Sequence, residues 1–207
     1  MEAYLDNSAT TRVDAQVQEL MKKLMDVDFG NPSSRHQKGV VAEGYIKEAR
    51  QKIAATLKVD PKELIITSGG TESNNMALIG TALAAKRKGN HIITTAVEHP
   101  SVKATASFLE EQGFRITFLS VDSRGQISLE DLKEALTPDT ILVSIMYVNN
   151  EIGTIQPVEE AAKLVHATVP GAVFHVDAIQ AYGKVLIRPK QQGIDLLSVS
   201  SHKFHGP

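Results

Sequence analysis

Short runs of apolar and β-branched residues alternate with amphipathic segments through most of the chain. The clearest run, 140–148 (TILVSIMYV), is almost entirely apolar or β-branched. Strands of this continuous kind are typical of a parallel sheet that is buried on both faces, and the segments between them form crossover helices. The alternation therefore predicts an α/β fold built from βαβ units.

The predicted elements follow one another closely after residue 63. Strands are predicted at 64–67, 91–96, 115–121, 140–148, 172–176 and 196–200. Helices are predicted at 76–89, 102–111, 128–136 and 158–169. The first sixty residues are predicted to be mostly helical, with a Gly-Asn-Pro-Ser-Ser loop at 30–34. Ligands bind folds of this class at the carboxyl ends of the strands, so the residues that follow each strand are the candidate site.

Charge and composition exclude several classes of protein. Lys and Arg number 22 and Asp and Glu number 24, a net charge of −2, which argues against a nucleic-acid partner. No apolar run approaches the roughly 18 residues of a membrane span. The N-terminus lacks the features of a signal peptide, so we expect a cytoplasmic location and no membrane partner. The chain has no cysteine, which excludes disulfides, thiolate metal sites and a cysteine nucleophile within it, and no metal site is predicted.

Glycines and hydroxyl-bearing residues follow the first predicted strand. Ser68-Gly69-Gly70-Thr71-Glu72 combines a tight turn with the start of a helix. The free N–H groups and the positive dipole end of such a helix bind anions, so Gly70 and Thr71 form a candidate phosphate site. The spacing is not that of a P-loop, and an ordinary strand-to-helix turn with a Thr cap is the alternative.

Two further strand ends carry a ring and an amide. His99 lies in a Glu-His-Pro-Ser turn after the strand 91–96, where its ring can stack on a planar ligand. A capped surface turn is the alternative there. Asn149 follows the buried strand 140–148, where polar groups need hydrogen-bond partners. An Asx turn would satisfy this amide without any ligand.

The last two strand ends carry an acid and an amine. Asp177 ends an apolar strand, and a buried carboxylate needs a compensating Arg, Lys or cationic ligand. Lys203 follows the strand 196–200 and is flanked by Ser, His and Phe residues. A lysine that is desolvated among polar groups can act as an amine nucleophile, although most lysines are solvated surface residues.

Together these residues match what pyridoxal phosphate needs from a protein. The cofactor requires a lysine for a Schiff base, an acid on its pyridinium nitrogen and a helix N-terminus for its phosphate. Lys203, Asp177 and the Gly70–Thr71 turn supply them. The negative charge of Asp177 would keep the ring nitrogen protonated, so that the ring accepts electrons from a substrate carbanion.

The chain resembles the NifS/IscS-type cysteine desulfurases, which belong to the class V aminotransferase group of fold-type I pyridoxal phosphate enzymes. The motifs that carry this resemblance are YLDNSATT at 4–11, FGNPSS at 29–34, TSGGTESNN at 67–75, EHPS at 98–101, VNNEIGTIQP at 148–157, HVDAIQAYGK at 175–184 and SSHKFHGP at 200–207. The resemblance implies a three-layer large domain with a mostly parallel, mixed sheet of seven strands between helices. It also implies an N-terminal arm at 1–14 and an incomplete cofactor-binding domain at 15–207, without the C-terminal small domain.

The resemblance also implies a role for each candidate residue. Lys203 would form the Schiff base and later shuttle protons, and His99 would stack on the cofactor ring and assist proton transfer. Asp177 would pair with the pyridinium nitrogen and Gln180 with the ring hydroxyl. Asn149 would lie beside the ring hydroxyl and the substrate carboxylate. The residues that would hold the phosphate are Gly70, Thr71, Ser200 and His202.

The reaction that the resemblance implies is a sulfurtransferase reaction of sulfur metabolism. It converts L-cysteine to L-alanine and passes the sulfur as a persulfide to an enzyme cysteine, then to a scaffold protein of iron–sulfur cluster assembly. The resemblance also implies a homodimer. Because this chain has no cysteine and ends just after Lys203, we expect it to need a cysteine-bearing C-terminal part, on the same or a separate polypeptide, and to be inactive alone.

Two alternatives stay open. One is a related class V lyase or aminotransferase, such as a selenocysteine lyase, on the same fold. The other is a non-catalytic assembly module, which the missing cysteine favours. The intact set of Lys203, Asp177, His99 and Gln180 argues against a module that binds no cofactor.

Overall fold

The chain forms two compact units in a computed structural model that describes residues 3–207. One unit comprises the chain up to Ile66 together with Ser201–Pro207, and the other comprises Thr67–Ser200.

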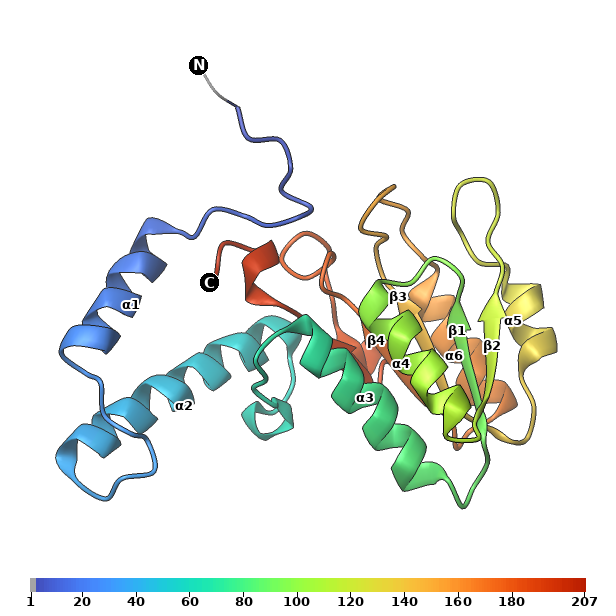
Figure 1. Cartoon of the computed structure of the whole chain (residues 1–207), viewed down its shortest axis with the longest axis horizontal. Helices are drawn as coiled ribbons and strands as arrows, with labels where there is room; N and C mark the ends of the chain where they lie inside the picture. The colour runs from blue at the N-terminus through green and yellow to red at the C-terminus, as the bar shows by residue number, and fades with distance from the viewer. Residues whose placement is uncertain (1–2) are drawn as a thin grey trace. The chain divides into compact units, whose positions relative to one another are not determined.

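A parallel sheet forms the centre of the unit Thr67–Ser200 (Figure 1). Its strands are β1 (His91–Thr95), β2 (Arg115–Leu119), β3 (Thr140–Met146), β4 (Val173–Asp177) and β5 (Leu196–Ser198). The order across the sheet is β2-β1-β3-β4-β5, and every neighbouring pair is parallel. All of β1 and β3 is buried, as continuous apolar strands in a covered sheet should be.

Helices cover both faces of this sheet. They are α3 (Gly70–Ala85), α4 (Pro100–Glu111), α5 (Leu129–Ala135), α6 (Val158–Thr168) and α7 (Pro189–Gln192). In Figure 1, α3 and α4 lie in front of the strands and α6 lies behind them. Ser128 caps α5, since its side chain accepts a hydrogen bond from Asp131 N at 3.2 Å. The predicted α/β class is confirmed.

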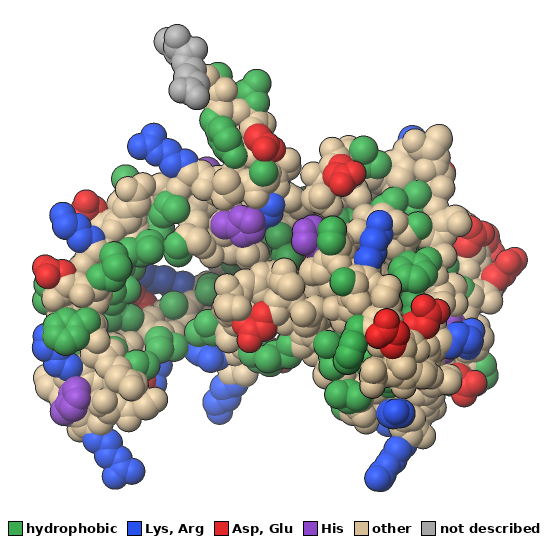
Figure 2. Space-filling view, viewed as in Figure 1, with side chains coloured by type: hydrophobic (Ala, Val, Ile, Leu, Met, Phe, Trp, Pro, Cys, Tyr) green, Lys and Arg blue, Asp and Glu red, His purple; other side chains and the backbone are tan. Residues whose placement is uncertain are grey.

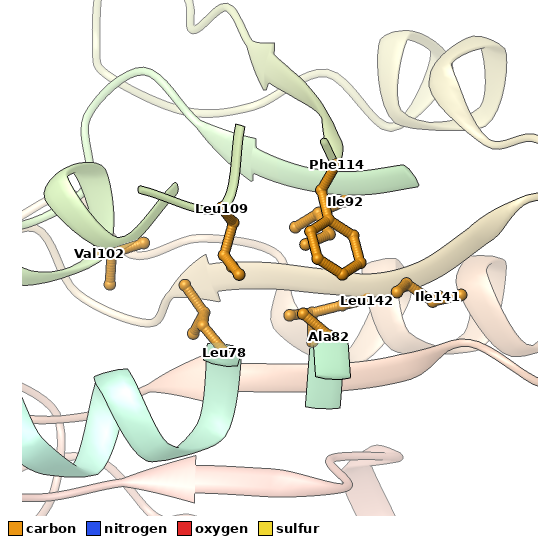
Figure 3. Close-up of a cluster of buried hydrophobic side chains, with 8 residues drawn as sticks. All are labelled: Leu78, Ala82, Ile92, Val102, Leu109, Phe114, Ile141 and Leu142. Carbon is orange, nitrogen blue, oxygen red and sulfur yellow. The ribbon is translucent and has the colours of Figure 1, made fainter. Parts of the chain in front are cut away.

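The core beneath α3 and α4 consists of interlocking aliphatic side chains and the ring of Phe114 (Figure 3). Leu78 of α3 and Leu109 of α4 are fully buried against Leu142 of β3. Burying each such side chain stabilises the fold by roughly 1.5–3 kcal/mol. This packing fixes the N-termini of α3 and α4 at the edge of the sheet where the strands end.

One predicted strand is wrong, and so is the predicted number of strands. Residues 64–67 are irregular and follow a short 3₁₀ helix, η1 (Pro61–Glu63). Ile65 and Ile66 are 70% and 61% exposed, because no strand of the sheet pairs with them within residues 3–207. The described residues therefore form a five-stranded parallel sheet, where seven strands of mixed direction were expected.

The other unit is mostly helical, as predicted. Its elements are α1 (Ala15–Asp26), α2 (Gln37–Leu57), η1 and a second 3₁₀ helix, η2 (Ser201–Lys203). Within this unit the N-terminal segment is tied to the C-terminal one. Thr11 N donates to His202 O at 2.8 Å, and Asp14 N donates to His205 O at 3.0 Å. These bonds hold η2 against residues 10–14.

Some large hydrophobic side chains are exposed on the surface of the molecule (Figure 2). On α3 and α4, these include Met76, Leu83 and Phe108. Throughout residues 3–207, every helix is too short or too polar to cross a bilayer.

Candidate active site

The carboxyl ends of β1, β3, β4 and β5 share one edge of the sheet because all these strands are parallel. Backbone hydrogen bonds continue the pairing past the strand ends. Tyr147 N donates to Asp177 O at 2.8 Å, and Ala178 N donates to Ser198 O at 2.9 Å. The loops that follow β3, β4 and β5 therefore start side by side.

The N-terminus of α3 lies at the same edge. Gly69 is the N-cap residue and gives no side-chain cap, so the first N–H groups of α3 are not taken by a capping side chain. A Cβ atom at Gly70 would lie 2.3 Å from Ile179 Cδ1 and 3.5 Å from Ser200 Cβ. Thr71 is exposed and lines an open depression of about 540 Å³ on α3. Gly70, Thr71 and Ser200 are thus brought together around a helix N-terminus, as an anion site requires.

His99 is the N-cap residue of α4. Its Nδ1 accepts a hydrogen bond from Ser101 N at 3.1 Å and lies 2.8 Å from Ser101 Oγ. The ring itself is exposed, so its faces are open to a planar ligand. The capped turn that the sequence left as an alternative is therefore present, and stacking of the exposed ring on a ligand stays a prediction.

Asp177 ends β4 and is only 4% exposed. Its Oδ2 accepts from Asn74 Nδ2 at 2.8 Å, and its Oδ1 accepts from Ile179 N at 3.0 Å. Both of these donors are neutral amides, and they hold the carboxylate in place. Gln180 is buried in the turn that follows, on the same loop.

Asn149 builds an Asx turn after β3. Its Oδ1 accepts from Glu151 N at 2.9 Å and from Ile152 N at 3.0 Å. Its Nδ2 donates to Val97 O at 3.0 Å and contacts Met146 Sδ at 3.4 Å. The side chain therefore joins the loops after β1 and β3. Sulfur is a weak acceptor, so one N–H of this amide is only weakly used.

His202 and Lys203 belong to the other unit, in η2. Lys203 Nζ donates to Ser8 O at 2.5 Å and to Ala9 O at 2.7 Å. Both acceptors lie in the YLDNSATT motif, so two of the motifs found in the sequence meet within this unit. Burial, and then the charge of Lys203, lower the pKa of His202 below its usual value.

Three functional candidates escaped the sequence analysis, namely Asn74, Ser101 and Glu98. Asn74 Nδ2 lies 3.0 Å from Ser101 Oγ, between Asp177 and His99. Glu98 is buried, and its Oε1 accepts from Thr95 Oγ1 at 2.8 Å and from Met146 N at 2.9 Å. Burial raises the pKa of Glu98 to about 8. All three lie inside quoted motifs, but only the fold brings them to the predicted residues.

Helices on both faces of a parallel sheet, with polar loops at its carboxyl edge, are the architecture of α/β enzymes that bind a ligand at that edge. The chain belongs to the class-V aminotransferase family, whose sequence profile matches residues 3–207. The resemblance inferred from the motifs is thereby confirmed. Pyridoxal phosphate is the cofactor of this family, as predicted.

Similar proteins carry desulfurase names. Cysteine desulfurase IscS of Dictyoglomus turgidum is 50% identical over 206 residues, which are 100% of this chain and 52% of that protein. Cysteine desulfurase IscS of Methanosarcina thermophila is 48% identical over 204 residues, which are 99% of this chain and 50% of that protein. The chain thus spans about half the length of the curated relatives it matches.

Solved structures give the same picture. A NifS-like protein superposes with a TM-score of 0.97 at 43% identity, covering 100% of this chain and 57% of that one. The structure of SspA in complex with cysteine superposes with a TM-score of 0.95 at 40% identity, covering 100% of this chain and 59% of that one. At these identities the likeness extends beyond the fold.

The residues of the unit Thr67–Ser200 fit the family cofactor. The phosphate needs close backbone approach and free N–H groups, and the uncapped start of α3 at Gly70 offers both. The pyridine ring needs an acid at its nitrogen, and Asp177 is a buried carboxylate at the same sheet edge. His99 offers an exposed ring there for stacking.

Proposed function

We propose that this chain is the cofactor-binding part of a pyridoxal phosphate-dependent cysteine desulfurase. The observation that carries the proposal is the joining of Asp177 and His99 at the carboxyl edge of the sheet through the side chains of Asn74 and Ser101. The desulfurase names of relatives about half identical to the chain add support. The similar protein SspA is solved in complex with cysteine, which supports cysteine as the substrate of this chain's site.

The proposed cofactor contacts divide by chemistry. Lys203 would hold the cofactor covalently through Nζ, and Asp177 would keep the ring nitrogen protonated. Gln180 would donate to the ring hydroxyl, and His99 would stack on the ring. The phosphate would be held by the start of α3 together with Gly70, Thr71, Ser200 and His202.

When bound, pyridoxal phosphate supplies an acceptor for the electrons that are released at the substrate α-carbon. The residues of this chain position the substrate and move protons. Asn149 would turn its weakly used N–H, now on Met146 Sδ, toward the substrate carboxylate. Lys203 Nζ and His99 Nε2 are the groups that would take and return protons beside the ring.

The sulfur-accepting step needs a residue that this chain does not contain. Cysteine is absent from its sequence, so the persulfide cysteine would come from a C-terminal part on the same or a separate polypeptide. We further propose, from the resemblance, a homodimer in the cytoplasm that delivers sulfur to an iron–sulfur scaffold protein. The domain division into an arm at 1–14 and a cofactor-binding domain at 15–207 is part of this proposal.

A substrate titration tests the proposed function. The chain is loaded with pyridoxal phosphate, and its visible absorbance is followed as L-cysteine or, as the matched control, L-serine is added. We expect a spectral change with L-cysteine at lower concentration than with L-serine, and no catalytic release of alanine and sulfide. The variant Asp177→Ala should lose the response.

Other outcomes separate the alternatives. A stronger response to selenocysteine than to cysteine would favour a selenocysteine lyase. Failure to bind the cofactor at all would favour a non-catalytic module. Catalytic release of alanine and sulfide by this chain would contradict the need for a cysteine-bearing part.

A further inference from the structure

A continuous chain of side-chain hydrogen bonds joins Asp177 to His99. Asn74 Nδ2 lies 2.8 Å from Asp177 Oδ2 and 3.0 Å from Ser101 Oγ. Ser101 Oγ in turn lies 2.8 Å from His99 Nδ1. Asn74 is fully buried, and Asp177 and Ser101 are nearly so. This series of hydrogen bonds therefore runs beneath the sheet edge and reaches solvent only at the His99 ring.

The Asp177 carboxylate determines which group donates in each hydrogen bond between Asp177 and His99. An ionised carboxylate only accepts, so the amide of Asn74 must present its NH₂ group to Asp177. The second hydrogen of the same NH₂ group then points to Ser101 Oγ. A hydroxyl that accepts there has its own hydrogen free to donate to His99 Nδ1.

The Asn74 amide oxygen is left without a partner among the described residues in this orientation. Asn74 Oδ1 is buried and has no hydrogen-bond donor within the described part of the chain. The reversed amide would place Oδ1 against the Asp177 carboxylate, which is worse, because two acceptors would then face each other in a buried site. The unpaired oxygen is thus a consequence of orienting the NH₂ group toward Asp177.

His99 receives two donors at one ring nitrogen. Ser101 N–H donates to Nδ1 at 3.1 Å, and the Ser101 hydroxyl donates to the same atom. A nitrogen that accepts two hydrogen bonds carries no proton, so the neutral ring carries its proton on Nε2. No hydrogen bond takes Nε2 within residues 3–207, so that proton faces outward on the exposed ring.

We propose that Asn74 and Ser101 are positioning residues that transmit the charge of Asp177 to His99 and hold the His99 ring in the Nε2–H tautomer. The inference rests on the proposed function, in which Asp177 contacts the nitrogen and His99 the face of one cofactor ring. It gives both residues a role that the sequence motifs did not assign. The acid that would pair with the ring nitrogen thereby sets which atom of the stacking ring holds a proton.

Long-range ¹H–¹⁵N NMR spectra of the full ¹⁵N-labelled chain, without cofactor, test this proposal. The variant His99→Gln identifies the ring signals of His99. In the wild-type chain we expect an unprotonated Nδ1 and a protonated Nε2 at neutral pH. A mixture of both tautomers in the wild-type chain would overturn the proposal without any further substitution.

The substitution Asn74→Asp should reverse the direction of the hydrogen bond between position 74 and Ser101. A carboxylate at position 74 cannot donate to Ser101, so the Ser101 hydroxyl turns to donate to it and leaves His99 Nδ1. We expect the Nδ1-protonated fraction of His99 to rise roughly five-fold or more, the factor that corresponds to a hydrogen bond of about 1 kcal/mol. The variant Ser101→Ala should raise it in the same direction, and Ser101→Thr should restore the wild-type spectrum.

The matched control is Asn75→Asp, on the next residue of α3. Asn75 Oδ1 accepts from Thr105 Oγ1 at 2.5 Å and is not part of the chain from Asp177 to His99. This variant should leave the His99 tautomer unchanged. An unchanged tautomer in both Asn74→Asp and Ser101→Ala would show that the Ser101 N–H alone holds the ring, and would refute the proposal.

The same variants separate this proposal from the proposed function. If the His99 spectra behave as expected but the protein binds no pyridoxal phosphate, the proposed function fails. The positioning role of Asn74 and Ser101 then still stands. If the cofactor binds but the tautomer does not respond to Asn74→Asp, the positioning role fails alone. In the loaded chain, Asn74→Asp should also shift the pH midpoint of the cofactor absorbance, which Asn75→Asp should not.

Discussion

His175 and His99 lie in the same unit but occupy opposite environments. His175 is in the middle of β4 and is fully buried, with Nδ1 2.8 Å from Ser144 Oγ and Nε2 3.0 Å from Ser198 Oγ. His99 lies just beyond β1, with an exposed ring and only Nδ1 hydrogen-bonded within the described residues. Both ring nitrogens of His175 are hydrogen-bonded within the protein, whereas Nε2 of His99 is available to a ligand.

This difference separates a structural histidine from a functional one. Burial lowers the pKa of His175 to about 3, so its ring stays neutral and serves as a core spacer between two hydroxyls. His91, at the start of β1, is similar, with ring nitrogens 2.8 Å from Thr140 Oγ1 and 2.9 Å from Thr117 Oγ1. Position at the carboxyl edge, and an unused ring nitrogen, mark His99 as the residue available for chemistry.

The largest expected effect comes from removing His175. The variant His175→Ala leaves a cavity and two buried hydroxyls, of Ser144 and Ser198, without their ring partner. We expect the free energy of unfolding to fall by about 3–5 kcal/mol. Urea unfolding followed by circular dichroism measures it. A loss below about 1 kcal/mol would show that this histidine is not part of the core.

Acid should weaken the fold through the same buried histidines. Burial lowers the pKa of His91 to about 4 and that of His175 to about 3, so between pH 6.5 and these values only the unfolded chain binds the protons. The stability from each neutral ring is complete above pH 6.5 and is lost as the pH falls. We expect a loss of roughly 3 kcal/mol per histidine by about pH 4.

Denaturant unfolding at a series of pH values tests this, with His91→Gln as the comparison. In that variant, the free energy of unfolding should fall less between pH 6.5 and 4, by the contribution of one histidine. An unfolding free energy that is flat between pH 4 and 6.5 in the wild-type chain would contradict the assignment of both rings as neutral.

Glu98 gives the opposite pH dependence at the functional edge. Burial raises its pKa to about 8, so the folded chain holds a proton that the unfolded chain releases above about pH 4.5. Stability from this group is complete at acid pH and is lost as the pH rises toward 8. The variant Glu98→Gln should therefore be more stable than the wild-type chain by roughly 4 kcal/mol at about pH 9, and should lose this advantage at acid pH.

The matched control for this measurement is Glu151→Gln, at an exposed residue of the loop after β3. Its unfolding free energy should follow the wild-type curve across the same pH range. A Glu98→Gln variant that is less stable than the wild-type chain at about pH 9 would mean that burial does not raise the pKa of Glu98.

The smallest expected effect is on stability in His99→Ala. The substitution removes the cap of α4 but leaves no cavity, since the ring is exposed. We expect a loss of about 1 kcal/mol of unfolding free energy, well below that of His175→Ala. Equal losses in the two variants, measured side by side in urea, would remove the distinction between them.

Local pattern predicted most of the fold. Continuous apolar runs such as 140–148 correctly indicated β3, because such a run has no other stable place than a covered sheet. The run 64–67 carried the same signal and failed, because Ile65 and Ile66 find no neighbouring strand within the described residues. An apolar run in the sequence shows that a segment could form a buried strand, but not whether a neighbouring strand is there to pair with it.

The site divides in the same way. Asp177 and His99 were predictable because each lies at or just beyond the carboxyl end of a strand. Asn74 and Ser101 were not, because 27 residues separate them in sequence and their meeting depends on the packing of α3 against α4. The neutral state of Glu98 was likewise hidden, since it follows from burial and not from residue type.

Borohydride reduction of the cofactor-loaded chain, followed by peptide mass mapping, tests the central claim that this chain carries a pyridoxal phosphate site. The account predicts one reduced cofactor adduct, located at Lys203, and its loss in Lys203→Ala. An unmodified chain after exposure to the cofactor, or an adduct spread over surface lysines, would contradict it.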